Sequence, residues 1–312
     1  MFAFSCKKKC VHPFYISVVV ADYPFHNRHA ASRIRHATPH FFPNTPNFMT
    51  DKTFELIRQF HPQPIQIPLN KQELETVIDT LIGSLFPIGN HMPPSDTQHK
   101  LLEVARTLHL NIAALCGEKA ADEKTEAFFG KLSALRECLY RDAFCYLHND
   151  PAAKTLEEVL ITYPGFYALC VYRLAHEIHL LGLPLMARLF SEHAHSKVGI
   201  DIHPAATIGE NLFMDHGTGI VVGETTRIGD NVKIYQGVTL GALYVEKRLS
   251  DVKRHPTVEE NVVIYANATI LGGETVIGHD STIGGGAWIT RSIAPYSLVY
   301  NTIDIKIRTL NK

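Results

Sequence analysis

Three short stretches of the chain combine ionisable side chains with glycine or proline. They are residues 215–219 (DHGTG), residues 254–256 (RHP) and residues 201–204 (DIHP). Histidine can take up and release a proton near neutral pH, because its unperturbed pKa is about 6.5. Arginine can hold a carboxylate through two parallel hydrogen bonds. These residue types make the three stretches candidates for proton transfer and for ligand binding.

The elements that must position these stretches are indicated by aliphatic residues at every sixth position across residues 200–290. A period of six fits neither the ~3.6 residues of a helical turn nor the alternation of a strand. It is typical of a β-solenoid, in which one aliphatic side chain per short strand points into a thin core. A sandwich is the alternative, but its strands alternate and turn at irregular spacing. The hexad residues are Ile202, Ile208, Met214 and Ile220, then Val222, Ile228, Ile234 and Leu240, then Val258, Ile264 and Ile270, and finally Ile277, Ile283 and Ile289.

The three stretches lie where this repeat begins or is interrupted. The register shifts by two residues at DHGTG, and a polar loop leaves the coil between residues 241 and 256. One further residue is inserted near Gly273 and Glu274. A histidine beside an aspartate at such a corner, followed by glycines, is expected to be exposed. Loops on one face of a solenoid commonly form its binding face.

Between residues 49 and 196 the sequence predicts helices. Asn70 is expected to cap a helix whose apolar residues share one face. Pro164 and Pro184 are expected to break the pattern. A bundle of this kind does not by itself indicate a function. The predicted helices are residues 52–60, a segment after Asn70, a segment from Asp96, and residues 123–148, 155–161, 167–181 and 185–195.

The first 48 residues differ from the rest of the chain, because they are basic and lack helical or strand periodicity. Their one short apolar run, residues 15–21, is at the lower limit for a signal peptide and lacks a clear cleavage site. We expect residues 1–48 to be a disordered or non-native extension, with Met49 as the natural start. An organelle transit peptide is the alternative.

Composition excludes several classes of protein. The formal net charge is −1 with 46% hydrophobic residues, which is ordinary for a globular protein and does not suggest a nucleic-acid or membrane partner. No apolar run approaches the ~20 residues that a membrane span needs. The 6 cysteines show no C-x-x-C spacing, which favours free thiols in the cytoplasm over disulfides or a zinc site.

The motifs, taken in order, resemble serine O-acetyltransferase, a family of hexapeptide-repeat acyltransferases. The resemblance rests on DIHPAATIG (residues 201–209), MDHGTGIVVGET (214–225), GVTLG (237–241) and RHP (254–256). DPAA (150–153) and PGFYALCVYRLAH (164–176) extend it into the helical region. The resemblance implies an α+β protein: an α-helical oligomerisation domain at 49–196, then a left-handed parallel β-helix at 197–312 with a loop at 243–256.

The family transfers acetyl from acetyl-CoA to the hydroxyl of L-serine, giving O-acetyl-L-serine for cysteine biosynthesis. A serine hydroxyl is a weak nucleophile at neutral pH, so its attack on a thioester needs a base. The resemblance implies that His216 is this base. It implies that Asp201 orients the imidazole and stabilises the imidazolium.

The resemblance also assigns the groups that bind serine. Asp150 and Asp215 match carboxylates that hold the ammonium group, and Arg254 matches the residue that pairs with the carboxylate. His255 matches a second active-site histidine that donates to the substrate or to the tetrahedral oxyanion. Asp150 has a simpler alternative, since it precedes a proline where one helix ends and the next begins.

Acetyl-CoA is expected in a groove between neighbouring subunits, where small residues let the pantetheine arm approach the backbone. Gly241, Ala242, Ala266 and Gly285 match these positions. The chain departs from the family at residues 265–267 (YAN), where relatives often have Gly-x-Gly. Lys306 or Arg308 is a candidate for the cofactor's phosphates on charge alone.

The resemblance implies a homotrimer around the solenoid, paired through the helices into a hexamer, with L-cysteine as a feedback inhibitor. Relatives that bind cysteine synthase use a longer C-terminal tail that ends in isoleucine. Because this sequence ends in Leu310, Asn311 and Lys312, we do not expect the complex with cysteine synthase to form in that way.

Three alternatives remain open at this point. A γ-type carbonic anhydrase is also a solenoid, but it needs three histidines around zinc. A sugar O-acetyltransferase shares the repeat but has no need for Arg254 opposite two carboxylates. An inactive solenoid used for assembly has no need of His216 or Asp201. No bound metal is expected.

Overall fold

The computed structural model describes residues 51–59, 67–87, 94–244, 252–302 and 308. The chain divides into two compact units, Met1–Pro64 and Ile65–Lys312. In the first, the described part is one helix, α1 (Asp51–Gln59), close to the predicted 52–60. The predicted extension at 1–48 lies outside the described residues. None of the described helices is long and apolar enough to cross a membrane.

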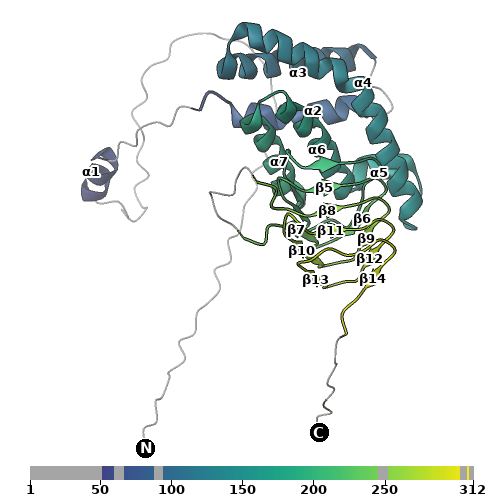
Figure 1. The fold of residues 1–312 in the computed structure, drawn as a ribbon. Helices are drawn as coiled ribbons and strands as arrows, with labels where there is room; N and C mark the ends of the chain where they lie inside the picture. The colour runs from purple at the N-terminus through teal and green to yellow at the C-terminus, as the bar shows by residue number, and fades with distance from the viewer. Residues whose placement is uncertain (1–50, 60–66, 88–93, 245–251, 303–307, 309–312) are drawn as a thin grey trace, which may run out of the picture. The chain divides into compact units, whose positions relative to one another are not determined.

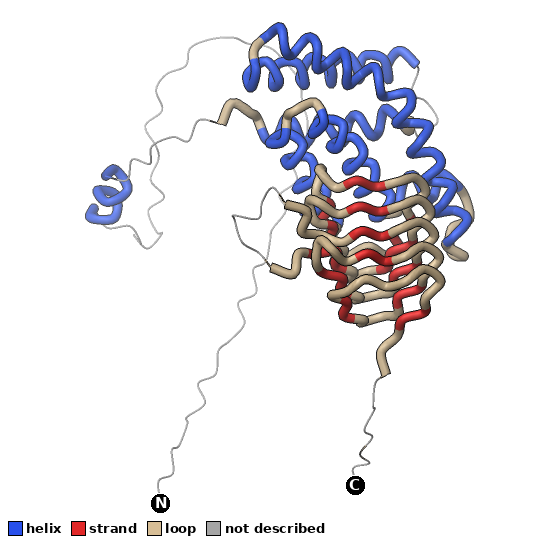
Figure 2. Tube along the Cα trace, viewed as in Figure 1, coloured by secondary structure: helices blue, strands red, loops and turns tan. Residues whose placement is uncertain are grey.

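The second unit begins with helices and continues into a solenoid, as predicted (Figures 1 and 2). The domain boundary predicted at residue 196 stays a prediction. The last helix ends at Val198, and the first strand begins at Asp201. The helices are α2 (Lys71–Leu85), α3 (Pro94–Cys116), α4 (Glu118–Asn149), α5 (Leu156–Thr162), α6 (Pro164–Leu180) and α7 (Pro184–Val198).

The helix boundaries follow from local chemistry. The Asn70 side chain accepts a hydrogen bond from the Glu73 N–H, which confirms the predicted cap of α2. Pro164 and Pro184 stand at the predicted breaks between helices. They begin α6 and α7, because a first helical residue has no internal partner for an N–H and tolerates proline. The predicted starts at 167 and 185 were therefore too late.

The solenoid consists of three parallel sheets that the chain visits in rotation (Figure 2). We name them sheet A, sheet B and sheet C. Sheet A contains β1 (Asp201–Ile202), β4 (Val221–Val222), β7 (Thr239–Gly241), β10 (Thr269–Leu271) and β13 (Trp288–Ile289). Sheet B contains β2 (Thr207–Ile208), β5 (Arg227–Ile228), β8 (Thr257–Val258) and β11 (Val276–Ile277). Sheet C contains β3 (Phe213–Asp215), β6 (Lys233–Tyr235), β9 (Val263–Ile264), β12 (Thr282–Ile283) and β14 (Leu298–Val299).

The hexad prediction is confirmed, because every residue of the four tracks is buried. Equivalent residues of successive coils pair directly, as Ile202 does with Val222 and Val222 with Leu240. The interruptions fall at the corners between sheets. DHGTG forms the corner from sheet C to sheet A, and the loop that ends in RHP leaves at the corner from sheet A to sheet B. The middle of that loop lies outside the described residues.

The third corner, from sheet B to sheet C, carries a ladder of side-chain amides that the hexads do not reveal. Asn211, Asn231 and Asn261 each have φ 58°, a left-handed conformation that asparagine tolerates better than most residues. Their side chains bond in series, at 3.0 Å and then 3.2 Å. Asn261 continues the series to Asp280 at 3.2 Å. The ladder thus links each of these turns to the turn of the next coil by a side-chain hydrogen bond.

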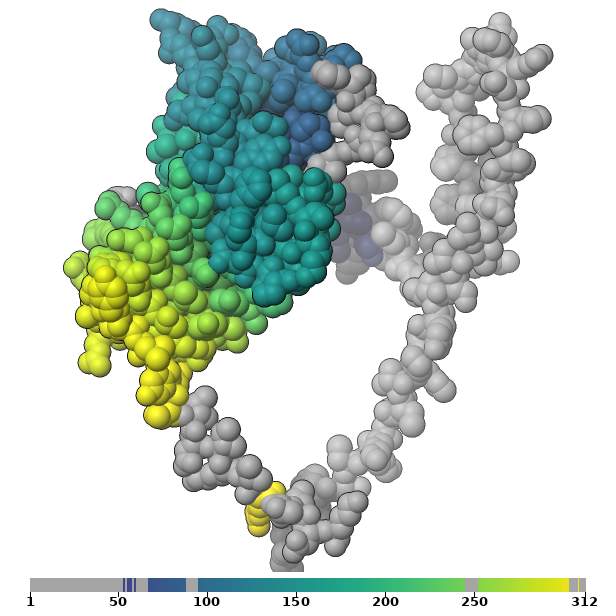
Figure 3. Space-filling model, turned by 90° about the vertical axis from the view of Figure 1, so that its right-hand side faces the viewer, coloured from purple at the N-terminus to yellow at the C-terminus, as the bar shows by residue number. Residues whose placement is uncertain are grey.

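The helices pack against the first coils of the solenoid (Figure 3). At the centre of this contact, the Arg173 guanidinium donates to both carboxylate oxygens of Asp142, at 2.5 and 3.0 Å. Arg173 also donates to the Gly209 carbonyl at 2.8 Å, and Asp142 accepts from the Asn211 N–H at 2.9 Å. The buried ion pair therefore joins α4 and α6 to the turn after β2.

We predict that Asp142→Asn lowers the free energy of unfolding by about 3–5 kcal/mol, because it leaves the buried Arg173 charge without its counterion. Urea unfolding followed by circular dichroism measures this. Arg141→Gln is the matched control, because the neighbouring Arg141–Glu210 pair is exposed and should leave the unfolding curve nearly unchanged. Equal midpoints for the two variants would contradict the role given to the buried pair.

Candidate active site

His216 is held in an unusual backbone conformation at the corner from sheet C to sheet A. Its φ is 56°, and Gly217 and Gly219 follow at 82° and 81°. A Cβ on Gly217 would overlap the Ile200 side chain, so only glycine fits there. Eight positions instead of six separate Met214 from Val222, and the additional residues push the corner outward. The His216 side chain is consequently 71% exposed, as predicted.

Two carboxylates lie near the His216 imidazole. Asp215 Oδ1 lies 3.9 Å from His216 Nε2. Asp150 accepts a hydrogen bond from the Tyr163 hydroxyl at 2.6 Å. That bond, with one from the Ala152 N–H and the proximity of His216, holds the pKa of Asp150 below its usual value. We call Asp150, Asp215 and His216 the corner cluster.

Asp150 also marks a helix boundary, which was the simpler alternative in the sequence analysis. It caps the C-terminus of α4, and its Oδ1 accepts from the Ala152 N–H at 2.8 Å. Tyr146, in the last turn of α4, accepts a hydrogen bond from the Met214 N–H at 3.2 Å. The end of α4 is thus tied to β3, and this tie brings Asp150 to the corner that carries His216.

A second group of predicted residues lines a cavity of about 310 Å³ over sheet A and its corner with sheet B. We call it the sheet A cavity. It brings Asp201 together with Arg254 and His255, which lie far from Asp201 in the sequence. The complete lining is Arg188, Asp201, His203, Val221, Val222, Gly223, Glu224, Arg254 and His255.

Within the sheet A cavity, the Arg254 guanidinium forms an ion pair with Glu224. Burial alone would raise the pKa of Glu224, but the hydrogen bond from Arg254 and the charge of its guanidinium lower it below its usual value. Glu224 therefore stays ionised and orients Arg254. The sequence analysis did not identify Glu224 as a site residue, although its place in the VVGET motif was a signal.

His255 is a buried histidine, with 8% of its surface exposed. Burial and the adjacent Arg254 lower the pKa of His255 to about 4. Its ring lies against Gly223, where a Cβ would overlap the imidazole. His255 is therefore neutral at physiological pH, and it can serve as a hydrogen-bond donor or acceptor without carrying charge.

The structure does not bring all the predicted residues together in one chain. Asp201 lies in the sheet A cavity, and the described residues include no hydrogen bond or ion pair between Asp201 and His216. His216 lies at the corner from sheet C to sheet A, before β4, whereas Arg254 and His255 lie at the corner from sheet A to sheet B, between β7 and β8. One chain thus presents two partial sites, the corner cluster and the sheet A cavity.

The residues predicted to bind CoA also fall into two groups, which lie at different corners of the solenoid. Ala266 and Gly285 follow β9 and β12 at the corner from sheet C to sheet A, where the Ala266 carbonyl accepts from the Gly286 N–H at 2.9 Å. Gly241 and Ala242 lie at the end of β7, at the corner from sheet A to sheet B. Lys306 lies outside the described residues, whereas Arg308 is described and exposed.

Beside Ala266, the Tyr235 and Tyr265 rings stack with their centroids 5.0 Å apart and their planes 20° apart. Tyr235 pairs in register with Asp215, so the aromatic pair continues the row that carries the corner cluster. The resemblance described in the sequence analysis had implied a glycine near this position, where this chain has Tyr265. This surface is more apolar and less open than a glycine pair would leave it.

Among the described side chains, one group could hold a metal ion, formed by Glu192, His195 and Asp201. Their ligand atoms lie within 4.8 Å of one another, and His195 bonds Glu192 at 3.2 Å. In the part of the chain that the structure describes, no group of three histidines lies within that distance. His195, which the sequence analysis did not single out, lies beside the predicted catalytic Asp201.

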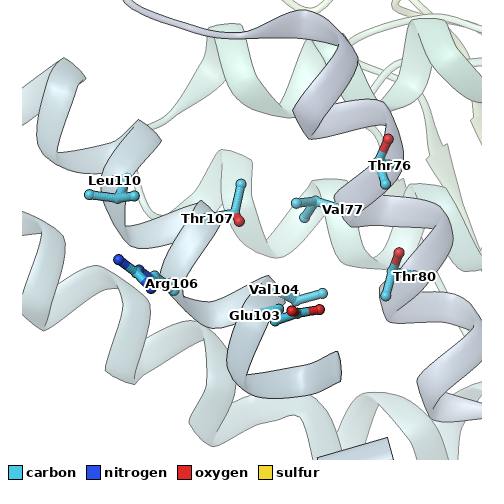
Figure 4. A pocket seen from close by; sticks show the side chains of 8 residues that line it. All are labelled: Thr76, Val77, Thr80, Glu103, Val104, Arg106, Thr107 and Leu110. Atoms are coloured by element: carbon cyan, nitrogen blue, oxygen red, sulfur yellow. The ribbon is translucent and has the colours of Figure 1, made fainter. Parts of the chain in front are cut away.

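A further cavity of about 430 Å³ lies between α2 and α3 (Figure 4). Its walls include Val77, Val104 and Leu110 together with threonines, and none of the predicted site residues contributes to it. It is not part of either partial site.

No family model matches the chain. Curated relatives do. The chain is 48% identical over 184 residues to the plasmid serine acetyltransferase of Synechococcus elongatus, covering 57% of each protein. It is 52% identical over 116 residues to the serine acetyltransferase of Helicobacter pylori, covering 37% of this chain and 66% of that protein. The chain thus spans between about half and two thirds of the length of these curated relatives.

Solved structures match over more of the chain. Serine acetyltransferase isoform 3 of Entamoeba histolytica, solved with cysteine, has a TM-score of 0.69 at 31% identity and covers 80% of this chain and 87% of its own. Serine acetyltransferase 1 of the same organism, solved with L-cysteine, has a TM-score of 0.67 at 32% identity, covering 80% and 95%. With shared helices, solenoid and motifs, this chain belongs to the serine acetyltransferase family.

Proposed function

We propose that the protein is a serine O-acetyltransferase, which transfers acetyl from acetyl-CoA to the hydroxyl of L-serine in cysteine biosynthesis. Membership of the family supports this proposal. The observation that carries it is the corner cluster, in which an exposed imidazole lies beside two carboxylates. An imidazole base next to anionic groups suits a substrate that carries both a hydroxyl and an ammonium group.

In the proposed mechanism, His216 takes the proton from the serine hydroxyl as the oxygen attacks the thioester carbonyl. The new C–O bond forms a tetrahedral oxyanion. When the oxyanion collapses, the C–S bond breaks and the imidazolium returns its proton to the departing CoA sulfur. Asp150 and Asp215 hold the serine ammonium, so that the hydroxyl faces the base.

Arg254, His255 and Asp201 complete the site in this proposal. Arg254 binds the serine carboxylate, and Glu224 supports its orientation. Asp201 orients His216 and stabilises the imidazolium. Because these three residues line the sheet A cavity, which does not include His216, we propose that the corner cluster of one subunit faces the sheet A cavity of the next.

A closed ring of three solenoids meets this requirement, since a heterologous contact repeated by rotation places the same two surfaces together at each interface. CoA would lie in the groove between subunits, with Ala266 and Gly285 from one copy and Gly241 and Ala242 from its neighbour. We propose that two such trimers pair through the helical region. Leu102 and Leu110 on α3 are exposed apolar residues that fit such a contact.

L-Cysteine is proposed as a feedback inhibitor, because it has the ammonium and carboxylate groups of serine with a thiol in place of the hydroxyl. The solved relatives from Entamoeba histolytica contain cysteine. We propose the cytoplasm as the location, supported by the free thiols of Cys116, Cys138, Cys145 and Cys170.

The direct test is the release of CoA thiol from acetyl-CoA by purified protein. We predict a signal that requires L-serine, falls when cysteine is added, and is absent with galactosides as acceptors. A signal with galactosides in place of serine would overturn the acceptor in favour of a sugar. Analysis of the purified protein for bound zinc checks the remaining alternative.

We predict that His216→Ala lowers kcat by roughly 10² or more, because it removes the base. The fold should be unaffected, since this side chain is exposed and packs against little. His279→Ala is the matched control: His279 also lies at a solenoid corner, and its Nδ1 bonds an adjacent aspartate, Asp280, at 2.7 Å. Full activity in His216→Ala would remove this residue from the mechanism.

The shared site makes a separate prediction. Chains with His216→Ala and chains with Arg254→Ala should each be inactive alone, but together they form interfaces in which both partial sites are intact. At equal amounts and random assembly, about one interface in four is intact, so about a quarter of the wild-type activity should return. Co-expression with two affinity tags isolates the mixed oligomers. Mixed oligomers without activity would show that each chain builds its whole site alone.

A further inference from the structure

We propose that Thr225 is a positioning residue that holds His255 in the tautomer with its proton on Nε2, so that His255 donates a hydrogen bond to the substrate beside Arg254. This inference rests on the proposed function for the identity of the substrate. It adds a residue that the motif comparison did not single out, and it restricts the role of His255 to that of a donor.

The Thr225 hydroxyl oxygen accepts two backbone hydrogen bonds. They come from the N–H groups of Arg254 and His255, both at 3.0 Å. A hydroxyl oxygen has two lone pairs, and both are used here. The hydroxyl proton is therefore left to donate, and its near neighbour is His255 Nδ1 at 2.9 Å.

A second donor from the same residue points to the same ring nitrogen. The backbone N–H of Thr225 donates to His255 Nδ1 at 3.1 Å. A backbone N–H can only donate, so this second bond also favours a ring without a proton on Nδ1, and the two donors act together. In a neutral imidazole the proton then lies on Nε2.

The surroundings keep the imidazole neutral and fix the direction of Nε2. Burial opposes a charge on His255, and so do Arg254, Lys253 and His203, while Glu224 acts in the opposite direction. The ring lies against Gly223, which prevents it from moving in that direction. Lys253 bonds the carbonyl oxygens of both Thr225 and His255, which holds the two backbone segments together.

His255 and His216 would therefore have different roles. His255 lines the sheet A cavity with Arg254, and its Nε2–H can donate to a substrate oxygen. It cannot accept the serine proton there, because the free lone pair of the ring faces Thr225. Proton abstraction is thus left to His216, on the other partial site.

Three variants test the role of Thr225. Thr225→Val keeps the shape but removes the hydroxyl, and Thr225→Ser keeps the hydroxyl. Thr226→Val is the matched control, because Thr226 is the next residue and its buried hydroxyl has no hydrogen-bond partner among the described protein atoms. Thermal unfolding of each variant checks that it is folded.

The first readout is the ¹⁵N NMR spectrum of protein labelled in its histidine rings, with the His255 signals identified by their loss in His255→Gln. In the wild type we expect a proton on Nε2 and no titration of His255 above about pH 5. In Thr225→Val only the backbone donor to Nδ1, at 3.1 Å, remains, so we expect a partial shift of the ring proton towards Nδ1 and a titration displaced towards the ordinary pKa of about 6.5. Thr225→Ser and Thr226→Val should resemble the wild type.

A wild-type His255 with its proton on Nδ1 would overturn the proposal, and so would a folded Thr225→Val variant whose tautomer and titration are unchanged. This readout requires no catalysis, so its outcome is independent of whether serine is the acceptor.

The second readout is kinetic. We expect Thr225→Val to lower kcat/KM for serine about tenfold, with an additional ionisation in the acid limb of its pH profile. Thr225→Ser should restore both to within about twofold of the wild type. A uniform loss with an unchanged pH profile would reduce Thr225 to a structural residue. Absence of serine-dependent activity in the wild type would instead count against the proposed function and leave the tautomer result standing.

Discussion

The thin core of the solenoid is the constraint on which the rest of the structure depends. Each short strand contributes one aliphatic side chain to a core that three sheets share, and that side chain has no room to shift along the chain. Additional residues can only be accommodated at the corners, where they leave the coil. Both partial sites lie at such places: DHGTG widens one corner, and the loop ending in RHP departs from another. The regular core thereby determines at which corners irregular backbone, with the candidate site residues on it, is possible.

The helical region fixes the first coils and supplies part of the site. The buried Asp142–Arg173 pair satisfies backbone groups of the turn after β2, and Tyr146 bonds the backbone of β3. Both contacts come from the same two helices that deliver Asp150 and Tyr163 to the His216 corner. A buried ion pair is weak evidence for net stability, but loss of one partner is costly, so the junction is sensitive to single substitutions. The helices therefore hold Asp150 at the His216 corner, in addition to any role in assembly.

The two histidines of the motifs have opposite environments. His216 is exposed beside carboxylates, which suits a group that becomes positively charged during reaction. His255 is buried beside Arg254 and Lys253, and its Nδ1 accepts from Thr225, which suits a neutral donor. Their separation on opposite ends of sheet A strands is the reason why the proposed mechanism needs residues from two chains. In the proposed mechanism the oligomer is therefore needed to complete each site.

The sequence by itself determined the solenoid, because the hexads are a local pattern that the thin core demands of every strand. It also determined the exposed corner at His216 and the cap at Asn70, since both follow from neighbouring residues. Only the tertiary structure decided that Asp201 lines the sheet A cavity, that Glu224 pairs with Arg254 and that Thr225 contacts His255 Nδ1. These contacts join residues on different coils or across a loop. They depend on how the coils stack and which way each side chain points, and a six-residue period carries no information about either.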